Sequence, residues 1–82
     1  MYGVQFSLEA AAELIRIAEA VGSAVSVLNA ADRIRRKLEI DPAGQGVFLS
    51  EGLYYIDEAP LRAFYFVDVE SMVVEVTDFR IF

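Results

Sequence analysis

The spacing of apolar residues divides this chain of 82 residues into a helical first half and a strand-like second half. Residues 2–6 alternate apolar and polar side chains, a pattern that predicts a short strand. From residue 8 the apolar positions recur every three or four residues, which is typical of a helix with one buried face. These positions are Leu8, Ala11, Ala12, Ile15, Ala18 and Val21.

Capping residues predict where two helices begin and end. Ser7 offers an oxygen to the first turn of a helix, and Gly22 stands where a left-handed C-cap is expected. Ser23 then starts a second helix, which Asp41-Pro42 ends, because a residue before proline is pushed out of the helical region. Helices joined by so short a connection must be antiparallel, so we expect an αα-hairpin.

After residue 46 the apolar period changes to two, which predicts strands. The expected strands are 47–50, 53–58, 61–69 and 72–79, with short turns between the members of each pair. Helices that precede a run of antiparallel strands indicate the α+β class. We therefore predict one domain, residues 1–82, with an N-terminal strand, an αα-hairpin and a three- to four-stranded antiparallel sheet.

Alternation assigns the residues of the last two strands to two faces. The predicted core face holds Leu61, Ala63, Tyr65, Val67 and Val69 from one strand and Met72, Val74, Val76 and Asp78 from the other. The second face holds Arg62, Phe64, Phe66, Asp68, Val73, Glu75 and Thr77. Its apolar members either pack on loops of the chain itself or form a strip that a partner or a second copy covers.

Composition and charge restrict the chemistry. The chain has no cysteine and no histidine, so it lacks a thiolate nucleophile and the usual general base at neutral pH, and we expect no metal and no cofactor. Five basic against four acidic residues in 1–37 sum to +1, whereas two against nine in 38–82 sum to −7. This charge disfavours nucleic acid. Without a long apolar run, we expect a soluble, cytoplasmic protein that does not enter membranes.

One basic run stands out against the acidic background. Its members are Arg33, Arg35, Arg36 and Lys37. A helix C-terminus favours cations through the helix dipole, which explains the run without any ligand. The alternative is that these four side chains contact RNA or an acidic partner.

Three segments together resemble the RelE/ParE toxin superfamily. They are the opening "VQFSLEAAAELIRI", the helix end "RRKLEIDPAGQG" and the strands "PLRAFYFVDVESMVVEVTDFRIF". The resemblance implies a bacterial toxin of a type II toxin–antitoxin or plasmid stabilisation system, with a small antitoxin protein as its partner. In the RelE branch it also implies an mRNA endoribonuclease that works on the ribosome.

The resemblance also implies roles for individual residues. Arg62 and Arg80 match the family's arginines, and guanidinium groups suit the stabilisation of negative charge during phosphate chemistry. The expected partner surface consists of Phe64, Phe66, Val73 and Phe79. Acids in the sheet region indicate that this cleavage is weakened. They also favour an alternative, a catalytically inactive protein-binding module of the same fold, for example a homodimer joined through Phe64 and Phe66. These acids are Asp57, Glu58, Asp68, Glu75 and Asp78.

Overall fold

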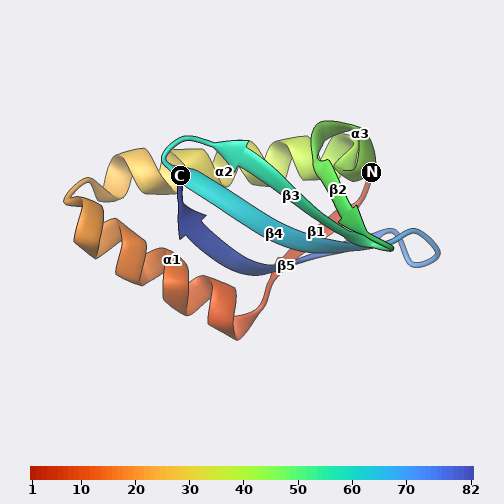
Figure 1. The fold of residues 1–82 in the computed structure, drawn as a ribbon, viewed down its shortest axis with the longest axis horizontal. Helices are drawn as coiled ribbons and strands as arrows, with labels where there is room; N and C mark the ends of the chain where they lie inside the picture. The colour runs from red at the N-terminus through yellow and green to blue at the C-terminus, as the bar shows by residue number, and fades with distance from the viewer.

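A computed structural model describes residues 1–82 as one layer of helices on one layer of sheet (Figure 1). The elements, in chain order, are β1 Gly3–Phe6, α1 Leu8–Val21, α2 Ala24–Ile40, α3 Pro42–Gln45, β2 Val47–Ser50, β3 Leu53–Glu58, β4 Leu61–Asp68 and β5 Val73–Ile81. The predicted α+β class and element order are confirmed. The connection between the second helix and the sheet contains an additional single turn of helix, α3.

The helices begin and end at the residues that the capping pattern predicts. Ser7 Oγ accepts a hydrogen bond of 3.0 Å from the backbone of Ala10, and Gly22 ends α1 with a left-handed φ of 76°. Asp41 ends α2 and also caps α3, because its Oδ1 accepts a 3.0 Å hydrogen bond from Gly44 N. Neither α1 nor α2 has the length and apolar content that a membrane crossing requires.

The sheet has five strands in the order β1-β5-β4-β3-β2. The prediction of three to four antiparallel strands is corrected here, because β1 joins the sheet beside β5 and runs parallel to it. The remaining neighbours are antiparallel. Figure 1 shows α2 behind the sheet, and the β2–β3 turn and the β4–β5 loop at the same end of the molecule. We call the sheet surface that faces away from the helices the outer face.

The core lies between the helices and the inner face of the sheet. The helices contribute mainly alanine and branched side chains, and the sheet contributes Tyr65 and Phe79 as its largest fully buried side chains. Phe79 packs edge-on against Phe6 with ring centroids 5.2 Å apart. Burial of such aromatic rings dominates the packing energy of a small core. No buried side-chain polar atom lacks a hydrogen-bond partner.

A β-bulge in β5 changes which side chains point outward. Phe64 of β4 pairs with Asp78 of β5, and the next residue, Tyr65, pairs with Val76. Thr77 of β5 is therefore the extra residue that has no partner in β4. The bulge reverses the alternation beyond it, as an inserted residue must. The prediction that Asp78 belongs to the core face is therefore wrong, since Asp78 shares the outer face with Phe64. Phe79 points into the core instead.

The start of α1 supports the bulge. Ser7 N donates to the carbonyl oxygen of Val76 at 2.9 Å, and Ser7 Oγ donates to the carbonyl oxygen of Thr77 at 3.4 Å. The Thr77 hydroxyl donates in turn to the carbonyl oxygen of Phe64. Backbone groups that the bulge removes from the strand ladder thus find partners, which makes the bulge a built feature of the fold.

Candidate functional site

The two arginines predicted as catalytic lie directly opposite each other on neighbouring strands. Arg62 near the start of β4 and Arg80 near the end of β5 are Cα partners in the antiparallel register. Side chains of such pairs leave the same face with Cβ atoms about 5 Å apart. The bulge at Thr77 is required for this arrangement, because uninterrupted alternation from Val76 would turn Arg80 toward the helices.

A carboxylate holds each of these arginines. Arg62 donates two hydrogen bonds to Asp57, of 2.6 Å from Nε and 2.9 Å from the terminal nitrogen, and these bonds raise the pKa of Arg62. Its guanidinium also lies 4.2 Å from the ring centre of Tyr55. Arg80 Nε contacts Asp78 Oδ2 at 3.0 Å, but its side chain is 69% exposed. Both positive charges are therefore balanced within the chain.

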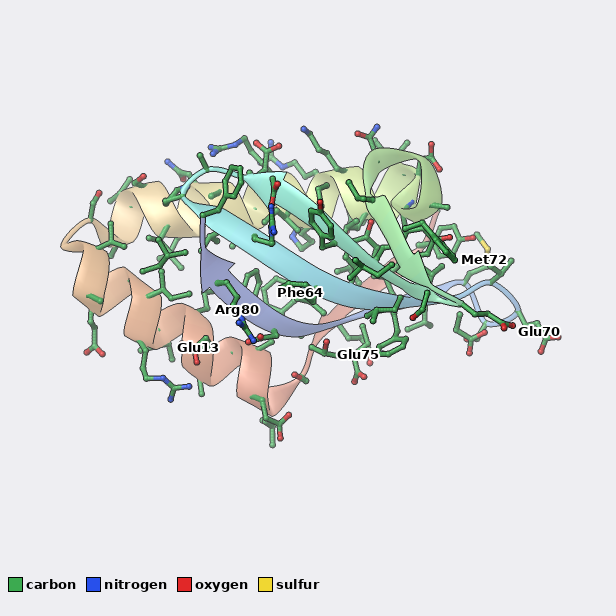
Figure 2. The ribbon with its side chains drawn as sticks, viewed as in Figure 1. Glu13, Phe64, Glu70, Met72, Glu75 and Arg80 are labelled. Carbon is green, nitrogen blue, oxygen red and sulfur yellow. The ribbon has the colours of Figure 1, made fainter.

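The side chains of the outer face form rows that run across the strands, and the rows differ in charge and polarity. One row pairs Asp57 with Arg62 and Arg80. The next row is largely apolar and contains Val47, Tyr55, Phe64 and Asp78, in the order β2 to β5. The third row contains Ser50, Leu53, Phe66, Glu75 and Gln5. The face thus passes from paired arginines through an apolar middle to an acidic end, and Figure 2 shows Arg80 and Glu75 well separated along it.

Three of the four residues predicted to bind a partner lie on this face. Phe66 is 48% exposed, and Phe64 and Val73 are half-buried. Phe79 departs from the prediction, because its side chain is 1% exposed and packs in the core. The reason is the bulge, which places Asp78 and Arg80 outward and Phe79 inward. Phe79 is thus a core residue and offers no surface to a partner.

The predicted basic run lies on α2, on the opposite side of the molecule from the outer face, and all four of its members are paired. Arg33 and Lys37 both contact Glu58, at 2.9 and 2.6 Å. Arg35 contacts Asp32 and Glu39, and Arg36 contacts Asp32. Four cations against three carboxylates leave a local charge of +1. These ion pairs stabilise α2 and join it to β3, and they leave no cation of the run unpaired for contact with RNA.

Asp57 and Glu58 are neighbours in β3, but their side chains form ion pairs on opposite faces of the sheet. Asp57 binds Arg62 on the outer face, whereas Glu58 binds the α2 cations on the helix side. Alternation along a strand puts neighbouring side chains on opposite faces, but the sequence alone did not identify Asp57 as the partner of Arg62. Pairing across the short β3–β4 turn is the signal that could have found it, because the two residues are only five apart.

Tyr55 is the only tyrosine whose ring lies against one of the two site arginines. Tyr65 is buried, its hydroxyl donates a 2.6 Å hydrogen bond to the carbonyl oxygen of Pro42, and burial raises its pKa. Tyr54 stacks on Tyr65 on the helix side, with ring centroids 5.7 Å apart. Tyr55 packs beside Phe64 on the outer face. The site therefore offers two guanidinium groups and one partly accessible phenol, without a histidine to exchange protons near neutral pH.

A hollow of about 400 Å³ adjoins Arg80 on the side of α1. It is lined by Glu13, Ile17, Asp78, Phe79, Arg80 and Ile81. Figure 2 shows Glu13 of α1 near Arg80 of β5. No group of three or more carboxylates lies close enough together to hold a metal ion.

The architecture defines the fold class: the chain has the α+β fold found in a toxin–antitoxin complex. Among solved structures it is similar to a chain of the toxin–antitoxin complex RelBE2 from Mycobacterium tuberculosis, with a TM-score of 0.80 and 18% sequence identity. The match covers 99% of this chain and 91% of that chain. No family model matches the sequence, and no curated protein matches it.

Proposed function

We propose that this protein is the toxin-like component of a type II toxin–antitoxin pair and that a small antitoxin protein binds it. The observation that carries the proposal is a fold likeness over nearly the whole chain to a chain of a toxin–antitoxin complex. The cross-strand pair of Arg62 and Arg80 on an open sheet face adds chemistry to that likeness. The setting we propose is the cytoplasm of a bacterium, with plasmid stabilisation as one role of such a pair.

The proposed activity is a weakened, ribosome-dependent cleavage of mRNA. In this proposal Arg62 and Arg80, which are cross-strand partners with Cβ atoms about 5 Å apart, bind one phosphate and stabilise the negative charge that develops during cleavage. The activity is weakened because Asp57 and Asp78 compete for the same guanidinium groups. Without a histidine, proton transfer falls to water, to the RNA or to ribosomal groups.

The test is growth after induction of this chain alone in a bacterial host, with mRNA ends mapped. Arrest with new mRNA ends is expected, and Arg62→Ala and Arg80→Ala are expected to abolish both. Arg16→Ala is the matched control, because Arg16 is 63% exposed, pairs with Glu13 and lies on α1. Arrest that survives both sheet variants would contradict the catalytic assignment, and arrest without cuts would point to a protein target.

A second candidate function is a catalytically inactive protein-binding module of the same fold. The two-bond pairing of Arg62 with Asp57 favours it, because a bidentate carboxylate occupies the geometry that a phosphate needs. This candidate predicts no growth arrest at confirmed soluble expression. If the module is a homodimer, light scattering gives twice the chain mass of 9.1 kDa, and Phe64→Asp restores the monomer. A monomer at high concentration would exclude that form.

A further inference from the structure

Apolar side chains on the outer face and along its β2 edge are exposed. On the outer face, Val47 of β2 is 50% exposed and Phe66 of β4 is 48% exposed. All four residues of β2 are exposed; Phe48, 62% exposed, packs edge-on against Tyr54 on the helix side of the same edge. Because β2 is an edge strand, its outer backbone groups are also unpaired. Exposed apolar side chains beside an open sheet edge are typical of an interaction site.

The unpaired charges around this apolar surface are all negative. Every one of the seven basic side chains of the protein lies within 4 Å of a carboxylate. Those bridges use six of the thirteen acids, so seven acids have no cationic partner. Four of these seven acids lie at one end of the sheet, and all four are exposed: Glu51, Asp68, Glu70 and Glu75.

The strand register places these acids around Phe66. Glu75 is its direct cross-strand neighbour on β5, and Leu53 is its neighbour on β3. A 2.9 Å hydrogen bond from Val67 N to the carbonyl oxygen of Gly52 joins β4 to the β2–β3 turn, where Glu51 lies. Asp68 ends β4, and Glu70 follows in the loop at the same end (Figure 2). The apolar surface is thus bounded on this end by unpaired negative charge.

From this arrangement we propose that the outer face binds a basic, amphipathic segment of a partner protein, with an apolar side chain on Phe66 and lysine or arginine side chains beside Glu51, Asp68, Glu70 and Glu75. The inference rests on the proposed function only in requiring a protein partner. A partner of this chemistry covers the apolar surface and supplies the missing positive charges together. Charge complementarity of this kind speeds association and selects among partners.

A second copy of the chain does not fit the same surface. Each copy carries a net charge of −6, and each brings the same unpaired acids to the contact. No basic side chain is free to meet them, since all seven are already bound to carboxylates. An acidic partner segment meets the same obstacle, because like charges placed together at an interface are repelled.

The experiment measures binding of two labelled synthetic peptides to the full chain. One peptide has a central run of leucines flanked by lysines, and the other carries glutamates in place of the lysines. We expect the lysine peptide to bind, with affinity that falls as salt rises, because exposed charges are screened. We expect the glutamate peptide not to bind. Backbone amide shifts in the NMR spectrum are expected at Leu53, Phe66 and Glu75.

Matched variants separate this site from a general effect of negative charge. Glu70→Gln with Glu75→Gln is expected to weaken binding of the lysine peptide by about tenfold. Glu9→Gln with Glu19→Gln makes the same change in net charge on α1 and is expected to leave binding unchanged. Phe66→Ala is expected to weaken binding, whereas Leu8→Ala, at a residue 86% exposed on α1, is not.

Three results would overturn the inference: equal binding of both peptides, equal effects of the two charge variants, or amide shifts confined to the helices. Self-association of the chain that covers Phe66 would also overturn it in favour of a second copy. The growth experiment is independent of these results. If the chain arrests growth but does not bind the lysine peptide, the proposed function stands and this inference is wrong. If the chain binds the lysine peptide but does not arrest growth, this inference stands and the proposed toxin function is wrong.

Discussion

Gly46 lies so close to Tyr65 that a side chain has no room there. A Cβ atom on Gly46 would stand 1.8 Å from the Tyr65 hydroxyl oxygen and 2.9 Å from the carbonyl oxygen of Tyr55. The same hydroxyl holds α3 in place through its hydrogen bond to Pro42. Gly46→Ala is therefore expected to lower the free energy of unfolding by about 2–3 kcal/mol, measured by urea denaturation.

Two further variants show whether the hydroxyl is the cause. Gly3→Ala is the matched control, because a Cβ there meets nothing closer than 3.9 Å, and its expected effect is below about 0.5 kcal/mol. Tyr65→Phe alone removes a buried hydrogen bond and is expected to cost about 1–2 kcal/mol. The double variant Gly46→Ala with Tyr65→Phe should cost less than the sum of the two. Strict additivity would mean that the clash lies elsewhere.

At the scale of elements, Glu58 joins the sheet to α2. Its two carboxylate oxygens accept hydrogen bonds from Arg33 and Lys37, and these bonds lower the pKa of Glu58 below its ordinary value of 4.5. A carboxyl whose pKa is lower in the folded protein contributes stability above the unfolded pKa and loses it as the pH falls through the folded pKa.

Glu58→Gln is accordingly expected to lower the free energy of unfolding at neutral pH by roughly 1 kcal/mol. The difference between the variant and the parent should shrink as the pH falls below the ordinary value of 4.5, since the parent then loses the same ion pairs. Urea denaturation between neutral pH and about pH 3 measures this. Glu19→Gln, at an exposed unpaired acid, is the control. A difference that stays constant with pH would contradict the ion-pair explanation.

Element boundaries could be predicted from the sequence because their signals are local. Ser7, Gly22 and Asp41 act on backbone groups within a few residues, so their effect can be inferred without the fold. The bulge at Thr77 depends on how β5 aligns with β4 and on Ser7, which is 70 residues away. The sequence therefore singled out Arg62 and Arg80 as candidate site residues, which the register brings together. It assigned Asp78 to the core face and Phe79 to the surface, and both assignments are wrong because of the bulge.

At the scale of the whole molecule, the distribution of charge disfavours non-specific binding of nucleic acid by the isolated chain. Cations are few and all are paired, whereas seven carboxylates are left without a partner. Total charge and the division of charge between the halves could be predicted from the sequence. Which acids are paired could not, because Asp57, Glu58 and Asp78 find their partners only through strand register and packing on α2.

The same distribution predicts how the isolated chain behaves toward RNA. Non-specific binding needs cations that can replace counterions along the phosphate backbone, and none is free here. We expect the dissociation constant for a single-stranded RNA oligonucleotide at physiological salt to be weaker than about 10⁻⁴ M, measured by fluorescence anisotropy. Asp57→Asn with Asp78→Asn removes the carboxylates that hold Arg62 and Arg80 and is expected to strengthen binding by about threefold or more.

The control for this last experiment must change the net charge equally without touching the arginines. Glu9→Gln with Glu19→Gln does so, because both pairs of substitutions take the net charge from −6 to −4. If the two double variants bind RNA equally, total charge alone governs the affinity and the paired arginines have no special part. If only the sheet variant gains affinity, Asp57 and Asp78 limit the access of phosphate to Arg62 and Arg80, and the acidity of this face restrains its proposed RNA chemistry.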